Sequence, residues 1–401
     1  MSKKNRKWLV FTIMCLAYMP GSYAQYQLSV YAPELIQSLG LTTSQFSSLF
    51  TAPMIVAIFL SFVGGMISDK VGSKKVINIS FVIAGIGMIG RVFANSYMPF
   101  FLCMALTGFS NMFVNINASK ITASWFEQEK LGILMGIFAF CGQLPGAFAT
   151  ATTAVLFDSR TSAFIVSAIF CISVFVLWLL FVKDKPEDTM EEREKIDQEN
   201  QPSIGDSLKV VLSNKGIWLV SICIMMALGS TVTLSTFMPM ALQTMYGIDL
   251  KVCGTIASML TLGNCIGSIT GPIVFSKIKN VKVFVSGAAV LSFAGIIMCW
   301  RFPSIFVLHI LVLYTGIMLG ASMPIFLSAP VLLEGLGTKY AGSAAGVIST
   351  LQLLGAVLIP TYILTPIAGE NYSLLFMLAS ICMVIMFLCG LLLPQFGNNQ
   401  K

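Results

Sequence analysis

The chain has 401 residues, of which 56% are hydrophobic and only 10% carry a charge. A soluble domain usually carries about 25% charged residues, so the composition excludes an ordinary water-soluble protein and favours one that crosses a membrane many times. The net charge of +7 is spread over short loops and forms no single basic face, so we expect no nucleic-acid partner. The ten cysteines are scattered without CxxC spacing, so we expect neither a disulfide framework nor a zinc site, and no cofactor.

Twelve apolar stretches are long enough to be membrane helices, because a helix needs about 20 mainly apolar residues to cross a bilayer. In the first half they are predicted at 8–33, 46–67, 76–93, 98–120, 131–157 and 161–182. In the second half they are predicted at 217–245, 252–275, 283–300, 304–328, 341–364 and 372–393. The first stretch follows a basic start like that of a signal peptide. It has no small-residue cleavage site, so we interpret it as an uncleaved membrane helix.

The charged segment at 183–209 divides the chain into two halves of six predicted spans each. Its dense mixture of acidic and basic residues is typical of a solvated tether. We therefore predict an all-α membrane protein with twelve transmembrane helices in two pseudo-symmetric six-helix bundles. The predicted N-terminal bundle is 1–182, the cytoplasmic linker is 183–215 and the C-terminal bundle is 216–401.

The lysines and arginines predict the orientation in the membrane, because these residues are concentrated in cytoplasmic loops. With the N-terminus inside, only four of the 24 fall outside, namely Arg91, Arg160, Lys251 and Arg301. Both termini are then cytoplasmic, which agrees with an even number of spans. Short loops with this bias favour a bacterial plasma (inner) membrane.

The two halves contain matching stretches at an offset of 206 to 210 residues. "PELIQSLGL" at 33–41 matches "PMALQTMYGI" at 239–248, and "GILMGIFAFCGQLPGA" at 132–147 matches "GSAAGVISTLQLLGA" at 342–356. Because each half has six spans, the two copies have the same orientation across the membrane. Parallel repeats of this kind, related by an axis along the membrane normal, occur in secondary transporters.

A short charged hairpin, "GGMISDKVGSKK" at 64–75, separates the second and third spans. It resembles the signature loop of the major facilitator superfamily, in which Gly, Asp and basic residues stand at fixed spacing. The matching residues are Gly65, Asp69, Lys70, Gly72, Lys74 and Lys75, with Ser73 where a basic residue is usual. With its twelve spans and its half-length repeat, the chain resembles that family over almost its whole length.

The resemblance implies that this hairpin is a gate. Gly65 allows another helix to approach closely, and Gly72 is free to adopt a positive φ for a tight reversal. Asp69 stands at the membrane edge, where it would face the N–H groups that begin the eleventh span, near Tyr340 and Ala341. The alternative is a plain, positively charged turn on the cytoplasmic side.

The resemblance also implies a solute site at mid-membrane between the two halves, where polar side chains are costly without a partner, water or solute. Thr107, Asn111 and Asn115 recur every four residues and are expected on one helix face. The predicted solute-binding residues are Gln25, Asn111, Asn115, Gln143, Asn264, His309 and Gln352. For each amide the alternative is an interhelical hydrogen bond, and for the single histidine it is a structural hydrogen bond.

No Asp or Glu falls in the middle of a predicted span. Coupling to protons and export of cationic drugs commonly use such a carboxylate. Its absence favours uniport, exchange, or coupling through His309 or Glu34. Arg91 and Lys120, toward helix ends, would draw an anion. We therefore predict a secondary active or facilitative transporter that moves a small organic solute, preferably an organic anion or a neutral metabolite, across the plasma membrane by alternating access.

Multidrug efflux is the alternative within the transporter class, because abundant Phe and Met form adaptable apolar pockets. A membrane-embedded enzyme is not expected, since the chain has one histidine and no paired acids at membrane depth. A receptor that binds its ligand without moving it is the remaining class. The expected partners are the small-molecule solute and the lipid bilayer, and the protein is expected to act as a monomer.

The gate interpretation makes a prediction for Asp69→Asn. Loss of the charge should slow transport several-fold and leave expression and equilibrium solute binding unchanged, because the carboxylate acts on the change of state and not on the solute. The measurement is initial flux in proteoliposomes beside a binding titration of the same preparation. Wild-type flux in this variant contradicts the gate.

Overall fold

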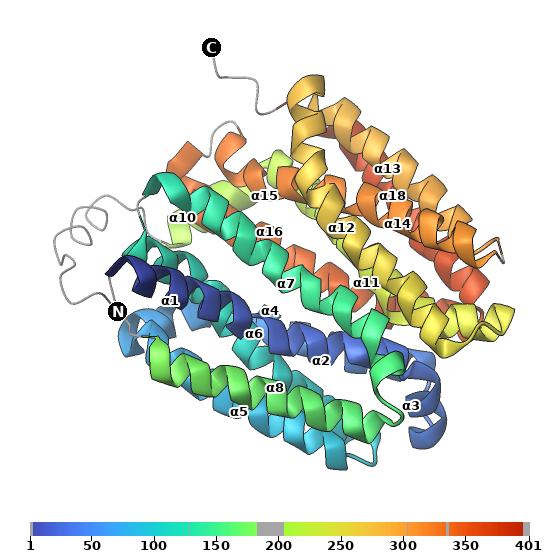
Figure 1. Ribbon diagram of the computed structural model, residues 1–401. Helices are drawn as coiled ribbons and strands as arrows, with labels where there is room; N and C mark the ends of the chain where they lie inside the picture. The colour runs from blue at the N-terminus through green and yellow to red at the C-terminus, as the bar shows by residue number, and fades with distance from the viewer. Residues whose placement is uncertain (1–2, 127, 183–203, 303, 334–336, 396–401) are drawn as a thin grey trace. The chain divides into compact units, whose positions relative to one another are not determined.

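The computed structural model describes residues 3–126, 128–182, 204–302, 304–333 and 337–395, and within these ranges every regular element is a helix. The first elements are α1 (Lys3–Ala17), α2 (Met19–Val30), α3 (Ala32–Leu39), α4 (Thr43–Val71), α5 (Ser73–Phe93), α6 (Tyr97–Trp125), α7 (Gln128–Leu156) and α8 (Arg160–Phe181). After residues 183–203, which lie outside the description, come α10 (Ile204–Ser213), α11 (Lys215–Tyr246), α12 (Leu250–Ile278), α13 (Val281–Met298), α14 (Ile305–Ala321) and α15 (Met323–Leu332). The last elements are α16 (Gly337–Leu358), the π-helix η1 (Ile359–Leu364), α17 (Thr365–Ala368) and α18 (Tyr372–Leu392), and Figure 1 shows their course.

The predicted all-α fold is confirmed, and each predicted span corresponds to observed helix. Eleven helices in the described ranges are long and apolar enough to cross a membrane. The exception is the predicted span 8–33, which is divided at Tyr18 into α1 and α2, so that neither part reaches the required length. Two later spans are also irregular: α14 and α15 meet at Ser322, and α16 continues through η1 at Pro360.

The helices form two compact units. One unit comprises Met1–Thr189 and Ile248–Ser258, and the other comprises Met190–Gly247 and Met259–Lys401. The predicted boundaries at 182 and 216 stay a prediction. Within the described part of the proposed linker lie α10 and the first residue of α11, Lys215.

The first unit has an apolar core to which α1, α5, α6, α7 and α8 contribute. Trp178 of α8 is fully buried there. Phe81 of α5 stacks on Phe175 of α8 with ring centroids 5.4 Å apart. Stacked aromatic pairs of this kind contribute about 0.5–1.5 kcal/mol beyond the area that they bury.

Glycines bring the helices of the first unit into backbone contact. A Cβ at Gly87 of α5 would lie 2.5 Å from the carbonyl oxygen of Cys103 in α6. A Cβ at Gly108 of α6 would lie equally close, 2.5 Å, to the carbonyl oxygen of Pro53 in α4. Helix pairs in membranes pack through such small residues, because lipid provides no hydrophobic force between helices.

The second unit repeats this packing with corresponding helices. A Cβ at Gly295 of α13 would lie 2.7 Å from Thr315 Oγ1 in α14, and one at Gly316 of α14 would lie 2.2 Å from the carbonyl oxygen of Leu260 in α12. Each of these glycines follows its counterpart in the first unit by 208 residues. The packing therefore supports the internal repeat at positions beyond those that the sequence comparison matched.

A further glycine in each half packs against the first helix of that half. Gly146 of α7 receives the ring of Tyr26 from α2, with 2.9 Å to the position of an added Cβ. Gly355 of α16 lies against the backbone of Met225 in α11, where the corresponding distance to the carbonyl oxygen is 2.5 Å. Gly146 and Gly355 belong to the matching stretches of the repeat, and each packs against the first helix of its half, although at a different height along it.

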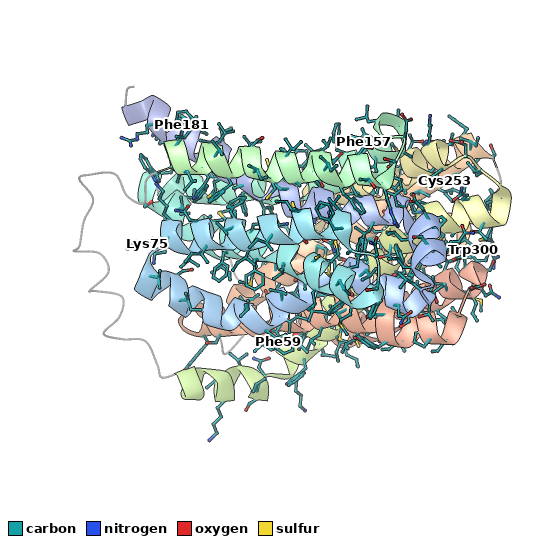
Figure 2. All side chains as sticks on the ribbon, turned by 90° about the horizontal axis from the view of Figure 1, so that it is seen from below. Phe59, Lys75, Phe157, Phe181, Cys253 and Trp300 are labelled. Carbon is teal, nitrogen blue, oxygen red and sulfur yellow. The ribbon has the colours of Figure 1, made fainter. Side chains whose placement is uncertain are left out.

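The helices carry large apolar side chains on their outer faces. Phe59 on α4 and Phe181 at the end of α8, both labelled in Figure 2, are 73% and 44% exposed. Leu180 beside the latter is 70% exposed. Apolar surface of this kind is stable against lipid tails and unfavourable in water, so these faces are expected to contact the bilayer.

The predicted positive φ of Gly72 is confirmed, since this single residue joins α4 to α5 with a φ of 95°. The equivalent turn in the second unit uses Lys279, whose φ of 55° is the one positive value among described non-glycine residues. Gln395 stabilises that turn by donating from Nε2 to the Lys279 carbonyl at 2.7 Å and accepting from Val281 N–H at 3.2 Å.

The two turns predict opposite effects on stability. Gly72→Ala should lower the free energy of unfolding by about 2 kcal/mol, because its backbone conformation is one that residues with a Cβ rarely adopt. Lys279→Gly should raise the free energy of unfolding by up to about 1 kcal/mol by relieving the left-handed conformation. Both are measured by thermal unfolding in detergent.

Gly85→Ala is the matched control for this experiment. Gly85 lies in the interior of α5 with open space around it, as Gly72 has, so alanine there should be neutral or slightly stabilising. Equal melting temperatures for the Gly72 and Gly85 variants would contradict the argument from backbone strain.

Candidate functional site: polar residues of the two units

The polar face of α2 is held from within the first unit. Gln25 is 7% exposed, and its Nε2 donates to the carbonyl oxygen of Phe50 in α4 at 2.8 Å. Ser29 is fully buried and donates to the carbonyl of Tyr26. The amide of Gln25 therefore has an intrabundle partner, and its predicted role in solute binding stays a prediction.

The predicted stripe on α6 turns gradually from the interior to the surface. Thr107 is fully buried, Asn111 is partly buried and Asn115 is exposed. A spacing of four residues advances by 400° around a helix of 3.6 residues per turn, so each step turns the stripe by about 40°. The single face expected from the sequence is therefore a spiral, and along it the side chains change from buried at Thr107 to exposed at Asn115.

Asn111 contacts α2, where its amide lies 3.0 Å from Ser22 Oγ. Asn115 forms no hydrogen bond with the described part of the chain. The two asparagines stand only one turn apart, but they differ in exposure, and only Asn111 has a hydrogen-bond partner among the described residues.

Asn117 is a buried polar residue that the sequence reading missed. It is 1% exposed, and its Nδ2 donates to Ser68 Oγ at 3.0 Å and to the carbonyl of Phe113 at 2.8 Å. Asn117 follows the fully buried Ser110 of the same helix by seven residues, or about two turns. Polar residues at this spacing lie on the same helix face, and that pattern in the sequence could have predicted the burial of Asn117. Its bond ties the last turns of α4, which carry the predicted gate, to α6.

The repeat-related glutamines and Asn264 lack partners inside their units. Gln143 is exposed on α7 and Gln352 is partly buried on α16. Asn264 is 9% exposed on α12, and its backbone is packed directly against Gly320 of α14. None of the three amides forms a hydrogen bond with the residues that the structure describes, and their predicted role in solute binding stays a prediction.

The two candidate coupling groups both have structural partners. His309 Nδ1 lies 2.8 Å from the carbonyl oxygen of Ile305, one turn earlier in α14. Glu34 of α3 forms an ion pair with Arg160 at the start of α8, with 3.3 Å between Oε1 and Nε. Arg160 also donates to Ser38 of α3 at 2.8 Å, so this cluster joins α3 to α8.

Arg91 is the one fully buried charged side chain in the described ranges, with 1% exposure. From α5 it donates to the Ala24 carbonyl and to Gln27 Oε1 of α2, both at 2.8 Å, and to the hydroxyl of Ser167 in α8. Its guanidinium also lies 4.3 Å from the centroid of the Phe164 ring. These partners are all neutral, so the positive charge of Arg91 is not compensated by a carboxylate among the described residues.

The predicted gate is described only in part. Residues 65, 69 and 70 belong to α4, but the side chains of Asp69 and Lys70 and the surroundings of Gly65 lie outside the description. Lys74 is partly buried and Lys75 is exposed at the start of α5, and Figure 2 labels Lys75. The adjacent Gly64 packs against α6, which places this end of α4 in close helix contact.

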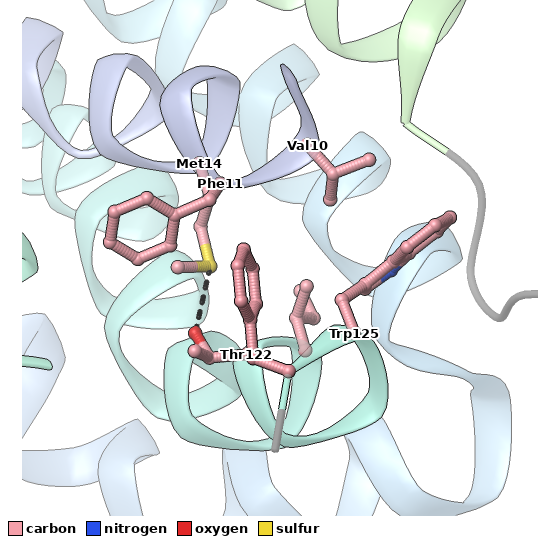
Figure 3. Close-up of a pocket in the computed structure, with 7 residues that line it drawn as sticks. Val10, Phe11, Met14, Thr122 and Trp125 are labelled. Atoms are coloured by element: carbon pink, nitrogen blue, oxygen red, sulfur yellow. Dashed lines mark hydrogen bonds between the residues drawn. The ribbon is translucent and has the colours of Figure 1, made fainter. Parts of the chain in front are cut away.

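Among the described residues, one crevice at helix ends has a mainly apolar lining and another has a partly polar one. Figure 3 shows the mainly apolar one, which lies between α1 and α6, is lined by groups including Val10, Phe11 and Trp125, and leaves no room for a water molecule. Its hydroxyl, Thr122 Oγ1, already lies 4.0 Å from Met14 Sδ and donates to a backbone carbonyl at 2.7 Å. The other crevice, in the second unit, is lined by Asn214, Lys215, Gly216, Leu219, Lys282, Leu333, Leu392, Leu393 and Pro394.

The apolar outer faces and the repeated close packing of long helices are those of a protein that crosses a membrane many times. A solved structure of a bacterial homolog of the human lysosomal transporter Spinster, inward-facing and unoccupied, has the same fold. The TM-score is 0.76 over 98% of this chain and 95% of that chain, at 13% sequence identity.

The sequence profile of the Major Facilitator Superfamily matches residues 10–360. The chain therefore belongs to the Major Facilitator Superfamily, as its hairpin motif predicted. It is a multi-pass membrane protein of a family of transporters.

Individual relatives are distant but match most of the chain. A probable sulfoacetate transporter, SauU, of Cupriavidus necator is 24% identical over 85% of this chain and 83% of its own length. A galacturonate transporter of Dickeya chrysanthemi is 23% identical over 74% of this chain and 90% of its own. The membrane sensor protein UhpC of Salmonella typhimurium is 23% identical over 88% and 83%.

The buried network predicts that Arg91→Ala destabilises the first unit by about 3 kcal/mol. The substitution leaves the acceptors on Ala24 and Gln27 without their donor, and hydrogen bonds to charged groups contribute about 1.5–3 kcal/mol each. Arg160→Ala is the control, because its half-exposed ion pair is worth about 1 kcal/mol or less. Thermal unfolding in detergent measures both, and an equal loss in the two variants would contradict the assignment.

Proposed function

We propose that this protein is a secondary transporter that moves a small organic anion across a bacterial plasma membrane by alternating access. The single observation that carries the proposal is the buried and uncompensated charge of Arg91 in a superfamily transporter whose relatives include carriers named for sulfoacetate and galacturonate. The substrate class that fits both the charge of Arg91 and the substrates named for these relatives is a compact, hydroxylated or short-chain solute with a carboxylate or sulfonate group.

The electrostatic argument favours an anion over a cation. Arg91 is held by neutral groups, so the interior of the first unit has a net positive potential. In a low-dielectric interior such a charge acts over a longer range than in water. A cationic solute would be repelled, and the described spans place no membrane-embedded carboxylate to receive it.

Direct recognition of the solute is proposed for amides that have no partner in their own unit. Asn115, Gln143, Asn264 and Gln352 supply neutral donors and acceptors, which suit carboxylate oxygens and sugar hydroxyls alike. Gln25, Asn111 and His309 have structural partners, and a direct role for them requires those bonds to open. The residues of the 64–75 hairpin are proposed as the gate.

Exchange or uniport is the proposed mode of transport. Proton coupling usually requires an ionisable group at membrane depth. Of the two candidates, Glu34 is ion-paired with Arg160 and His309 is bonded to its own helix. A transmembrane pH gradient is therefore not expected to drive accumulation.

A sensor without transport is the second candidate, because UhpC, a membrane sensor protein, matches most of this chain. Multidrug efflux remains the alternative within the transporter class. The two alternatives differ from the proposal in which compound, if any, crosses the membrane. A single flux assay can measure this difference.

The test is counterflow in proteoliposomes preloaded with unlabelled galacturonate or sulfoacetate and diluted into a trace of the labelled acid. The proposal predicts transient accumulation of label that is unchanged by a protonophore. Gln143→Ala should raise the KM about tenfold, which corresponds to the loss of about 1.4 kcal/mol from a hydrogen bond to a charged group. Gln37→Ala, an exposed glutamine of α3, is the matched control and should leave KM unchanged.

Saturable binding of these acids without any counterflow would support the sensor instead. Expulsion of unrelated hydrophobic cations, with no flux of acids, would support multidrug efflux. Accumulation that collapses with the pH gradient would contradict exchange and uniport.

A further inference from the structure

The first membrane helix is interrupted halfway through the first unit. The helix α1 ends at Ala17, Tyr18 is a turn residue, and α2 begins at Met19. Pro20 stands in the first turn of α2, so one backbone N–H is missing there, and no side chain of Tyr18 caps the new helix. Tyr18 N–H donates to the carbonyl oxygen of Cys15, three residues earlier, at 3.3 Å.

The interruption lies at membrane depth. It is packed against Asn111, which is the central residue of α6, a helix of 29 residues from Tyr97 to Trp125. Water is scarce at that depth, and each unsatisfied backbone group there costs several kcal/mol. A break at this place therefore requires a replacement donor and acceptor from elsewhere in the protein.

The side-chain amide of Asn111 supplies both. With its nitrogen facing Tyr18, Nδ2 donates to the Tyr18 carbonyl at 3.1 Å, and Oδ1 accepts from Ser22 N–H at 3.1 Å and from Ser22 Oγ at 3.0 Å. Tyr18 C=O and Ser22 N–H are the pair that would bond to each other in a continuous helix. The amide therefore takes the place of one peptide hydrogen bond in the ladder.

Two glycines make room for this arrangement. A Cβ at Gly21 would lie 2.6 Å from the nearer end of the Asn111 amide, which in this orientation is Nδ2, so any larger residue there would push the amide away. On the other side, Gly142 of α7 receives the ring of Tyr18, which stacks on Phe138 at 4.7 Å between centroids. The break is thus enclosed by α6 and α7 and is not a frayed helix end.

We propose that Asn111 is a positioning residue that completes the hydrogen-bond ladder of the broken first helix and thereby fixes how α2 presents its polar face. The segment that it fixes carries Gln25, which follows Ser22 by three residues. The side-chain amide of Gln25 donates a hydrogen bond to the Phe50 carbonyl of α4. This assignment differs from the solute-ligand role predicted from the sequence. A ligand would meet the solute with the amide, whereas here both ends of the amide are engaged by the backbone.

The test is hydrogen–deuterium exchange of the full chain in detergent, read on peptides that cover residues 15–26. Asn111→Ala should speed exchange at Ser22 about tenfold or more, because it removes a bond worth about 1.4 kcal/mol. Gly21→Ala changes no polar group, yet it should produce the same local effect by displacing the amide. The double variant should exchange no faster than either single variant, because both act on one contact.

Asn115→Ala is the matched control for exchange, since it removes the same side chain one turn along α6, where no hydrogen bond is made. It should leave residues 15–26 unchanged. Asn111→Leu keeps the side-chain volume if the alanine variant is poorly folded, and it should show the same increase. Wild-type exchange at Ser22 in the Asn111 variants, or additive effects in the double variant, would overturn the proposal.

A kinetic measurement separates positioning from binding. In the counterflow assay with labelled galacturonate, Gly21→Ala should lower kcat and leave KM within about twofold, because it touches no solute-binding group. A rise in KM for Asn111→Ala alone, with wild-type behaviour for Gly21→Ala, would show a direct ligand and overturn the assignment. The kinetic arm rests on the proposed function, whereas the exchange arm needs no solute, so failure of one is distinguishable from failure of the other.

Discussion

The whole structure depends on one constraint, which is that a backbone N–H or C=O inside a bilayer must find its partner within the protein. Regular helices satisfy it by themselves, so every described element is helical. Departures need substitutes. In the first helix an amide from α6 bridges the break, and in η1 the ladder shifts to i→i+5 bonds around Pro360, which lacks an N–H.

The same constraint explains how the helices pack. Lipid tails are as apolar as leucine, so association relies on close backbone contact and not on hydrophobic burial. Gly87 and Gly108 provide that contact in the first unit, and Gly295 and Gly316 provide it in the second. The two halves thus share a packing scheme as well as a sequence pattern, which is the physical content of the internal repeat.

The polar side chains singled out above fall into two groups, according to whether they form hydrogen bonds with neighbouring helices. Gln25, Asn111, Asn117 and Arg91 bond to neighbouring helices and hold the first unit together. Gln143, Gln352 and Asn264 form no such bonds with the described part of the chain, and solute binding is the role proposed for them. The distinction matters for any mutational study of the protein, because loss of transport in the first group reports on structure before it reports on recognition.

The sequence by itself determined the twelve apolar spans, the repeat and the positive φ of Gly72, because hydrophobic length, offset and residue type act locally along the chain. It also placed the family, through a hairpin of fixed spacing. It did not reveal that the span 8–33 is broken at Tyr18, or that Asn111 closes the break. It did not show that Asn117, and not Asn115, is buried. Those facts were decided by tertiary packing, because the partner of a polar side chain is set by which helix lies against it, and four-residue spacing drifts too quickly around a helix to name that partner in advance.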